Sequence, residues 1–321
     1  MCYNFEMNRL CVFAHWDKDN IVDDYVVYYL KALKEVANTI IFVSDCNLSE
    51  SEKSKLDGIV TFLLAEKHGE YDFGSYKRGF LYAKEHNISF DELIFANDSV
   101  YGPFYPLKLI FDKMSKKKCD FWGMTKNNYG LNEKSLKLIR EPHIQSYFLV
   151  FHENVYNSNI FINFINSISK QYSKSDVITK YEIGLSKTLY QNNFKSCAYI
   201  NRYGSISNCT IFKWDKLILK YNFPFLKTSI IKKGFDFTGA VKGWEEIIEK
   251  KSDYPIEYIK KNFDRLSDLY EDKYSQLNLY RKVRYDILKH FPVEVRYVVI
   301  FLEKAAFNIL NTICFNKLQK F

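Results

Sequence analysis

The sequence predicts an α/β fold in which a mostly parallel sheet is flanked by helices. Short apolar runs at residues 10–14, 39–43 and 93–96 have the length and composition of buried strands. Between the first two runs, residues 21–37 carry apolar side chains at helical spacing, which makes a strand–helix–strand unit of the kind that is usually parallel and right-handed. Each run is followed by polar residues, which would gather at one edge of the sheet, where open α/β sheets bind ligands.

Size and charge narrow the class of protein. The 321 residues are 47% hydrophobic and 26% charged, which fits one large globular domain or two smaller ones. The net charge of +8 suits an anionic substrate or an anionic membrane surface. This charge is dispersed, its longest block is residues 116–118, and no nucleic-acid-binding motif is present, so we expect no nucleic-acid partner.

Cysteine usage and the N-terminal sequence predict a cytoplasmic protein. The seven cysteines are odd in number and contain no Cys-x-x-Cys pair, which argues against a disulfide framework and against a zinc site. The first residues carry no signal-peptide pattern, and no apolar run approaches the ~18 residues that a membrane-spanning helix needs.

The first two strands end in side chains that suit a nucleotide. His15 and Asp17 follow the first strand and Asp45 follows the second, so all three would line one edge of the sheet. Acids at this position accept hydrogen bonds from a base or a ribose. Loop polarity and helix capping explain the same residues without a ligand.

A third strand is expected at residues 59–64, followed by a glycine-containing segment that enters a helix ending near His86. Lys77 and Arg78 lie close to the start of that helix, where an anionic phosphate would be favoured. The segment matches neither the P-loop nor the dinucleotide-binding fingerprint, so its two glycines are weak evidence alone.

Residues 91–104 form the segment around which we expect the chain to be organised. The apolar strand is followed at once by Asn97, Asp98 and Ser99. An aspartate just past a buried strand can hold a divalent cation and, through it, a diphosphate. Asn-Asp-Ser is also good turn chemistry, so an ordinary turn is the alternative.

Further helices and strands follow, and two of them carry candidate site residues. Residues 143–151 read as one strand with His143 and Gln145 on the same face. Glu182 lies near the expected start of a helix at residue 181, where it acts either as a general base or as an acid that stabilises the helix N-terminus. The remaining elements are helices at 106–114 and 161–168 and a strand at 121–125.

The C-terminal part is predicted to be helical. Residues 243–270 and 271–290 are charged and helical, and Pro292 separates them from a last, apolar helix at 294–315. That helix is too short to span a bilayer. It either packs as core or attaches the protein to an anionic membrane surface through its apolar face and nearby lysines.

Seven short motifs in one order resemble the rhamnan synthesis protein F family of bacterial glycosyltransferases, over roughly residues 9–230. The blocks Asn-Asp-Ser-Val-Tyr-Gly-Pro and His-Ile-Gln-Ser are the most specific. The motifs lie at residues 14–17, 42–45, 71–77, 96–104, 120–123, 143–148 and 181–186.

The resemblance implies a GT-A-like, Rossmann-type mixed sheet that binds a nucleotide sugar and carries the catalytic residues. We expect this domain at 1–230, followed by a helical region at 231–321, for which membrane association is the alternative to packing as core. It implies that Asp98 binds Mg²⁺ or Mn²⁺, although the sequence departs from Asp-x-Asp because Val100 stands where the second acid would be. Glu182 resembles the base of inverting enzymes. Residues implied for the donor are His15, Asp17, Asp45, Asp72, Lys77, Asn97 and Ser99, and those for the acceptor or sugar are His143 and Gln145.

The activity implied is transfer of a sugar, such as rhamnose, from dTDP-rhamnose or a UDP-sugar to a lipid-linked glycan during O-antigen or capsule synthesis. The protein would work at the inner face of the cell membrane. The alternative is a non-catalytic protein that binds glycan or nucleotide in a polysaccharide assembly complex.

Overall fold

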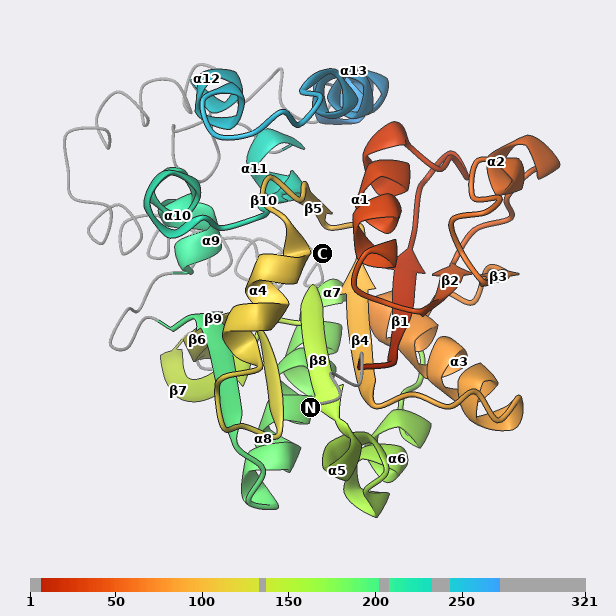
Figure 1. The fold of residues 1–321 in the computed structure, drawn as a ribbon, viewed down its shortest axis with the longest axis vertical. Coiled ribbons are helices and arrows are strands. Elements are labelled where there is room, and N and C mark those ends of the chain that lie inside the picture. Colours follow the sequence, from red (N-terminus) through yellow and green to blue (C-terminus); the bar gives the residue numbers. More distant parts are fainter. Residues whose placement is uncertain (1–6, 133–136, 202–207, 233–242, 272–321) are drawn as a thin grey trace, which may run out of the picture.

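The computed structural model describes residues 7–132, 137–201, 208–232 and 243–271. Its centre is an eight-stranded mixed sheet in the order β3-β2-β1-β4-β8-β6-β7, with β9 beside β6 (Figure 1). A two-stranded sheet of β10 and β5 lies apart from it. The strands are β1 (Arg9–His15), β2 (Thr39–Ser44), β3 (Phe62–Ala65), β4 (Glu92–Asn97), β5 (Val100–Tyr101), β6 (Phe121–Asn132), β7 (Lys137–Ile144), β8 (Phe148–His152), β9 (Ser196–Ile200) and β10 (Leu226–Lys227).

The predicted fold class is confirmed. Strands β3, β2, β1 and β4 are parallel to one another, and β9 is parallel to β6. Strand β8 joins the sheet antiparallel to β4 and β6. Strand β4 is buried at all six positions because helices cover both faces of the sheet. This explains why the three sequence runs read as continuously apolar rather than alternating.

Two helical layers form two cores, one on each face. One layer contains α1 and α4, with α10 beside them, and the other contains α3, α5, α6 and α8 (Figure 1). The helices are α1 (Asp24–Lys34), α2 (Glu50–Ser54), α3 (Tyr71–Glu85), α4 (Leu107–Met114), α5 (Glu153–Tyr156), α6 (Asn159–Asn166), α7 (Lys174–Val177), α8 (Gly184–Gln191), α9 (Cys209–Phe212), α10 (Trp214–Tyr221), α11 (Thr228–Lys232), α12 (Trp244–Glu249) and α13 (Glu257–Glu271).

The single strand predicted at 143–151 is wrong. The chain forms β7 up to Ile144, leaves the sheet, and re-enters it as β8 at Phe148. The cause is β6, which is longer than predicted: its first residues pair with β8 and β9, and its later residues form a ribbon with β7. Gln145 therefore lies in the connection and not on a strand face.

The helix start predicted near residue 181 is also wrong. Helical structure begins at Lys174, where the Ser173 hydroxyl accepts a hydrogen bond from the Asp176 N–H as a cap. It continues through a π-helical turn, Ile178–Ile183, into α8. Glu182 thus lies inside a helical run, so stabilisation of a helix N-terminus does not explain it.

The described part of the C-terminal region packs into the same core as the N-terminal strands and helices. Trp244, Ile248, Tyr254 and Ile259 are buried in the cluster that also contains α1 and α10 side chains. The division at residue 230 stays a prediction, and the expected helix at 294–315 lies outside the described residues. None of the helices in the described ranges combines the length and apolar character needed to cross a bilayer.

Close packing of α3 on the sheet predicts the effect of a small substitution. A Cβ at Gly79 would lie 2.3 Å from Val12 Cγ1, so Gly79→Ala should destabilise the protein by about 1–3 kcal/mol through overpacking. Gly184 is the control, because its Cβ would meet nothing nearer than 3.7 Å and alanine has the better helix propensity. Urea denaturation measures both; equal stabilities of the two variants would contradict this account.

Candidate active site

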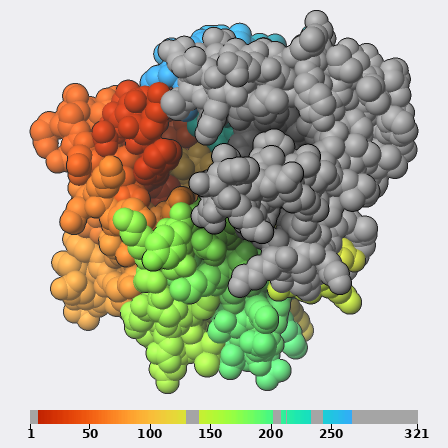
Figure 2. Space-filling view, turned by 180° about the vertical axis from the view of Figure 1, so that it is seen from behind, coloured from red at the N-terminus to blue at the C-terminus, as the bar shows by residue number. Residues whose placement is uncertain are grey.

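Two adjoining clefts open at the carboxyl ends of the parallel strands. The large cleft has a volume of about 870 Å³ and the small cleft about 460 Å³. In the space-filling view, the N-terminal segment in red and orange meets the green segment on the face turned away in Figure 1 (Figure 2). The two clefts share a wall made of Tyr71, Asp72, Ser99, Lys174, Thr228 and Ser229.

Three of the predicted donor residues line the large cleft at the ends of β1 and β2. His15 is 3% exposed, and its Nδ1 lies 2.9 Å from Ser44 Oγ. Burial lowers the pKa of His15 to about 4, so this ring is neutral near pH 7. Asp45 Oδ1 accepts hydrogen bonds from the backbone N–H groups of His68 and Gly69 at 2.6 and 2.8 Å, which holds the loop that leads into α3.

Asp17, the third of them, is paired with an arginine from the C-terminal region. Arg265 in α13 donates to both carboxylate oxygens of Asp17, at 3.2 and 2.5 Å. Burial alone would raise the pKa of Asp17, but the Arg265 bond and backbone N–H groups lower it overall. Asp17 Oδ1 also accepts from the N–H groups of Asp19 and Ile21, so this aspartate organises its own loop.

Asp98 links the ends of β1 and β4. Its Oδ2 accepts a hydrogen bond of 2.8 Å from the Trp16 N–H, and the carboxylate lines the large cleft. Burial raises the pKa of Asp98 to about 7, the negative charges of Asp72 and Asp17 add to this, and the nearby Lys232 opposes it.

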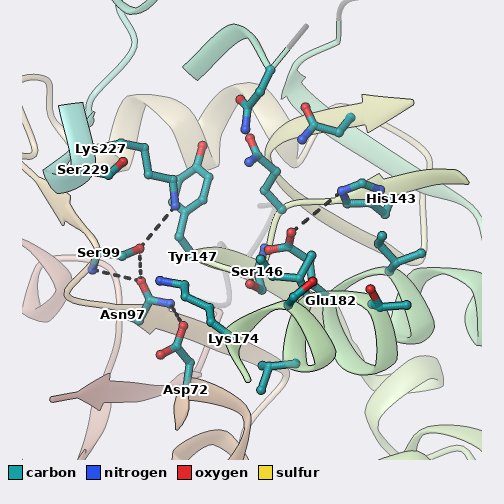
Figure 3. A pocket seen from close by; sticks show the side chains of 18 of the residues that line it. Asp72, Asn97, Ser99, His143, Ser146, Tyr147, Lys174, Glu182, Lys227 and Ser229 are labelled. Carbon is teal, nitrogen blue, oxygen red and sulfur yellow. Dashed lines mark hydrogen bonds and ion pairs between the residues drawn. The ribbon is translucent and has the colours of Figure 1, made fainter. Parts of the chain in front are cut away.

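A chain of hydrogen bonds runs along the wall between the clefts (Figure 3). Asn97 Nδ2 donates to Asp72 Oδ2 at 2.8 Å, and Asn97 Oδ1 accepts from the Ser99 hydroxyl at 2.6 Å. Lys227 Nζ donates to Ser99 Oγ at 3.2 Å and lies 3.9 Å from the centroid of the Tyr147 ring. The predicted residues Asp72, Asn97 and Ser99 therefore act as one connected set that borders both clefts.

Glu182 lines the small cleft from the π-helical turn. Its Oε2 accepts hydrogen bonds from the Ser146 N–H at 2.8 Å and the Ser146 hydroxyl at 2.5 Å. Its Oε1 lies 3.8 Å from Nε2 of His143, and Nδ1 of that ring is hydrogen-bonded to the Glu141 carbonyl at 2.7 Å. A carboxylate held by one oxygen, with the other facing a cleft, is well arranged to accept a proton. π-helical turns are frequent at functional sites.

The two residues predicted to contact the acceptor or sugar share one cleft, although the strand predicted to carry them is absent. His143 and Gln145 both line the small cleft. Gln145 Oε1 accepts a hydrogen bond of 2.6 Å from the Thr125 hydroxyl, which fixes this side chain between β6 and the connection to β8.

Lys77 is not brought to either cleft. Its Nζ donates to the backbone carbonyls of Asn166 and Ile168, at and just after the end of α6. Arg78 instead pairs with Glu70. The predicted role of Lys77 therefore has no support from the geometry of the described residues.

Five lysines that were not predicted as site residues line the clefts instead. Lys174 lines both, Lys227 lines the small one, and Lys18, Lys170 and Lys232 line the large one. Burial lowers the pKa of Lys227 to about 8, against the attraction of Glu182, and burial also lowers the pKa of Lys232. No local motif marks these lysines, because only folding brings their segments to the clefts.

The residues present fit a divalent cation only in part. Mg²⁺ is commonly held by one or two carboxylates, with substrate phosphates and water completing its shell. Asp98 and Asp72 offer two carboxylates on the large cleft. Within the described ranges, no group of three or more His, Cys, Asp or Glu side chains is arranged to hold a metal.

The raised pKa of Asp98 predicts a specific dependence of stability on pH. The pKa of Asp98 is about 7 in the folded protein and 3.8 for an unperturbed aspartate. Burial of the protonated side chain therefore contributes fully to the free energy of unfolding below pH 4, and this contribution is lost as the pH rises through 7. Asp98→Asn should therefore raise the melting temperature at pH 8.5 but change it little at pH 4.5. The measurement is thermal unfolding in a chelator; an equal shift at both pH values would contradict the burial of this charge.

Comparison with known proteins places the chain among relatives of low identity. It is 29% identical over 155 residues to the protein y4gN of Sinorhizobium fredii, and 31% identical over 178 residues to the virulence protein VirA of Vibrio anguillarum. These matches cover 48% and 55% of this chain but only 39% and 47% of the relatives, so the chain spans less than half the length of either.

Among solved structures, core-mannan synthase A of Aspergillus fumigatus in its Mn/GDP form aligns with 59% of this chain and 71% of its own. The identity is 9% and the TM-score 0.36. The decisive match is to the sequence family described as Rhamnan synthesis protein F, which covers residues 40–302. The chain therefore belongs to the rhamnan synthesis protein F family.

Proposed function

We propose that this protein is a glycosyltransferase that moves a sugar from a nucleotide-sugar donor to a glycan acceptor. The observation that carries the proposal is the shared wall between the clefts. A donor in the large cleft and an acceptor in the small cleft would meet at Asp72, Ser99 and Lys174, which line both. Transfer requires the anomeric carbon and the attacking hydroxyl to meet in this way while each is bound separately.

The large cleft suits the nucleoside diphosphate. Its volume of about 870 Å³ lies in the range of small-ligand sites. Lys174 and Lys232 offer positive charge where the diphosphate develops negative charge as it leaves. If Mg²⁺ or Mn²⁺ binds with the donor, Asp98 and Asp72 would hold it, and it would supply further neutralisation of that charge.

The small cleft suits the acceptor. In the proposed step, an acceptor hydroxyl oxygen forms a bond to the anomeric carbon, and the bond from that carbon to the diphosphate oxygen breaks. The electron pair of the broken bond leaves with the nucleoside diphosphate, and the hydroxyl proton passes to Glu182. Attack from the face opposite the leaving group inverts the configuration at this carbon.

Two neighbours keep Glu182 ready for this role. Ser146 donates two hydrogen bonds to Oε2, which leaves Oε1 to face the cleft and His143. Lys227 attracts the negative charge of Glu182 and also reaches Ser99 on the shared wall. Two changes would thus alter the electrostatic surroundings of Lys227. One is the proton that Glu182 accepts, and the other is the negative charge that the diphosphate gains.

The family match supports a more specific proposal for the donor, the acceptor and the pathway. We propose a rhamnose or related donor, carried by dTDP or UDP, and a lipid-linked acceptor in O-antigen or capsule synthesis at the cytoplasmic face of the cell membrane. The name of the Vibrio relative, a virulence protein, is compatible with a role in surface polysaccharide.

A non-catalytic binding protein is the second candidate, because Asp98 is followed by Ser99 and Val100 and not by a second acid. Incubating the protein with dTDP-rhamnose, UDP-sugars and GDP-sugars, with a lipid-linked rhamnose-containing acceptor and Mg²⁺, separates the two. Acceptor-dependent release of nucleoside diphosphate supports the transferase. Donor binding without release supports the binding protein, and absence of both contradicts the proposal.

Glu182→Gln should lower the rate of transfer ~100-fold or more, the usual scale for the loss of a general base, while donor affinity changes little. Glutamine keeps the size of the side chain but cannot take the proton. The matched control is Glu50→Gln, whose exposed side chain on α2 lies outside both clefts. Turnover under saturating donor measures the effect, and near-normal turnover by the Glu182 variant would exclude it as the base.

A lipid-linked acceptor would make attachment to a membrane useful, and we propose that the apolar sequence at 294–315 provides it. Full-length protein should then float with vesicles that contain anionic lipid at low salt and be released at high salt, because screening weakens the attraction of lysines. Vesicles of neutral lipid are the control. Protein that remains in the soluble fraction with both vesicle types would rule out this mode of attachment.

A further inference from the structure

Arg265 connects α13 to the loop that follows β1, across more than 240 positions of sequence. It contacts three aspartates of that loop: Asp17 Oδ2 at 2.5 Å, Asp19 Oδ2 at 2.7 Å and Asp23 Oδ2 at 2.6 Å. Its side chain is 21% exposed, and those of Asp17 and Asp23 are 8% and 14% exposed. At this degree of burial, solvent screens the charges less than at the open surface.

The charge of the large cleft makes this contact relevant to ligand binding. Among the described residues, five aspartates and four lysines line the cleft, so their formal charges alone give a negative sum. A negative cleft repels a diphosphate. Arg265 contacts two of the five, Asp17 and Asp23, and its single positive charge offsets this excess of negative charge. Its neighbour Leu266 lines the cleft. The aspartates are Asp17, Asp23, Asp45, Asp72 and Asp98, and the lysines are Lys18, Lys170, Lys174 and Lys232.

The contact also sets the geometry of the loop. Asp17, held by Arg265, accepts the N–H groups of Asp19 and Ile21. The residue before it, Trp16, donates its N–H to Asp98. The position of Trp16 at the mouth of the cleft, where its side chain is a largely exposed ring, therefore depends on a loop that Arg265 anchors.

We infer that Arg265 is a positioning and charge-compensating residue, supplied by the C-terminal region, that allows the large cleft to accept the diphosphate of a nucleoside diphosphate. The inference rests on the proposed function for the identity of the ligand. It assigns to Asp17 a role different from the predicted one. This aspartate does not bind base or ribose but pairs with Arg265. Residues of the loop after β1 and of α13 would then act together in recognition of the anion.

The test compares charged and neutral ligands by calorimetry on the full chain, with UDP and dTDP against uridine and thymidine. Arg265→Gln should weaken binding of the diphosphates about 10-fold or more at low salt, because uncompensated carboxylates remain near them. Binding of the nucleosides should change less than about twofold on the same reasoning, since they carry no charge to repel. Arg265→Lys should restore much of the diphosphate affinity, and the loss should shrink at high salt.

Arg78→Gln is the matched control, because Arg78 pairs with Glu70 and lies outside both clefts. Asp19→Asn tests the opposite sign: it removes one of the carboxylates that share Arg265 and should tighten binding of UDP. This result is independent of any folding defect in the Arg265 variant, since damage to the fold does not raise affinity for one charged ligand alone.

The outcomes separate the inference from the proposed function. If the unchanged protein binds no nucleoside diphosphate, the proposed function fails. If it binds them, but Arg265→Gln lowers affinity for diphosphate and nucleoside equally, or Asp19→Asn does not tighten binding of UDP, then Arg265 is only a structural tie and the inference is wrong.

Discussion

The parallel pairing of β1 with β4 is the constraint on which both clefts depend. Their register sets Ala14 opposite Asn97, so the residues after each strand emerge side by side at the same edge of the sheet. The bond from the Trp16 N–H to Asp98 then ties the two exits together. From Asp98 the chain turns through Ser99 into β5, which pairs with β10 and thereby brings Lys227 to the wall. A change in this register would separate the residues of the large cleft from those of the small cleft.

The parts of the site that the sequence predicts are those that follow directly from strands. His15, Asp17, Asp45 and Asp98 were recognisable because each stands just past a continuous apolar run, and a parallel sheet gathers such positions at one edge. The structure does bring these four to one cleft. Their individual roles were less predictable, since whether a carboxylate is free or already paired depends on partners far along the chain.

Errors in prediction arose where a local pattern has two structural solutions. The apolar run at 147–151 is preceded by alternating residues, which suits one long strand. The chain nevertheless breaks between Ile144 and Phe148, because the first part of β6 pairs with β8 and its later part pairs with β7. Lys174, Lys227, Lys232 and Arg265 carried no signal at all, because a single basic residue in an ordinary segment looks the same whether it faces solvent or a ligand. Only the tertiary arrangement distinguishes them.

The π-helical turn at Ile178–Ile183 has a consequence for how this site can vary. Such a turn accommodates one residue more than an α-helical turn, and each residue added to or removed from a helix rotates the following side chains by about 100°. The direction of Glu182 is therefore set by the number of residues in the segment as well as by their identity. Losing one residue of this turn other than Glu182 would leave every side chain of α8 chemically intact but rotate α8 relative to the carboxylate. The length of this segment therefore matters to the site as well as its composition.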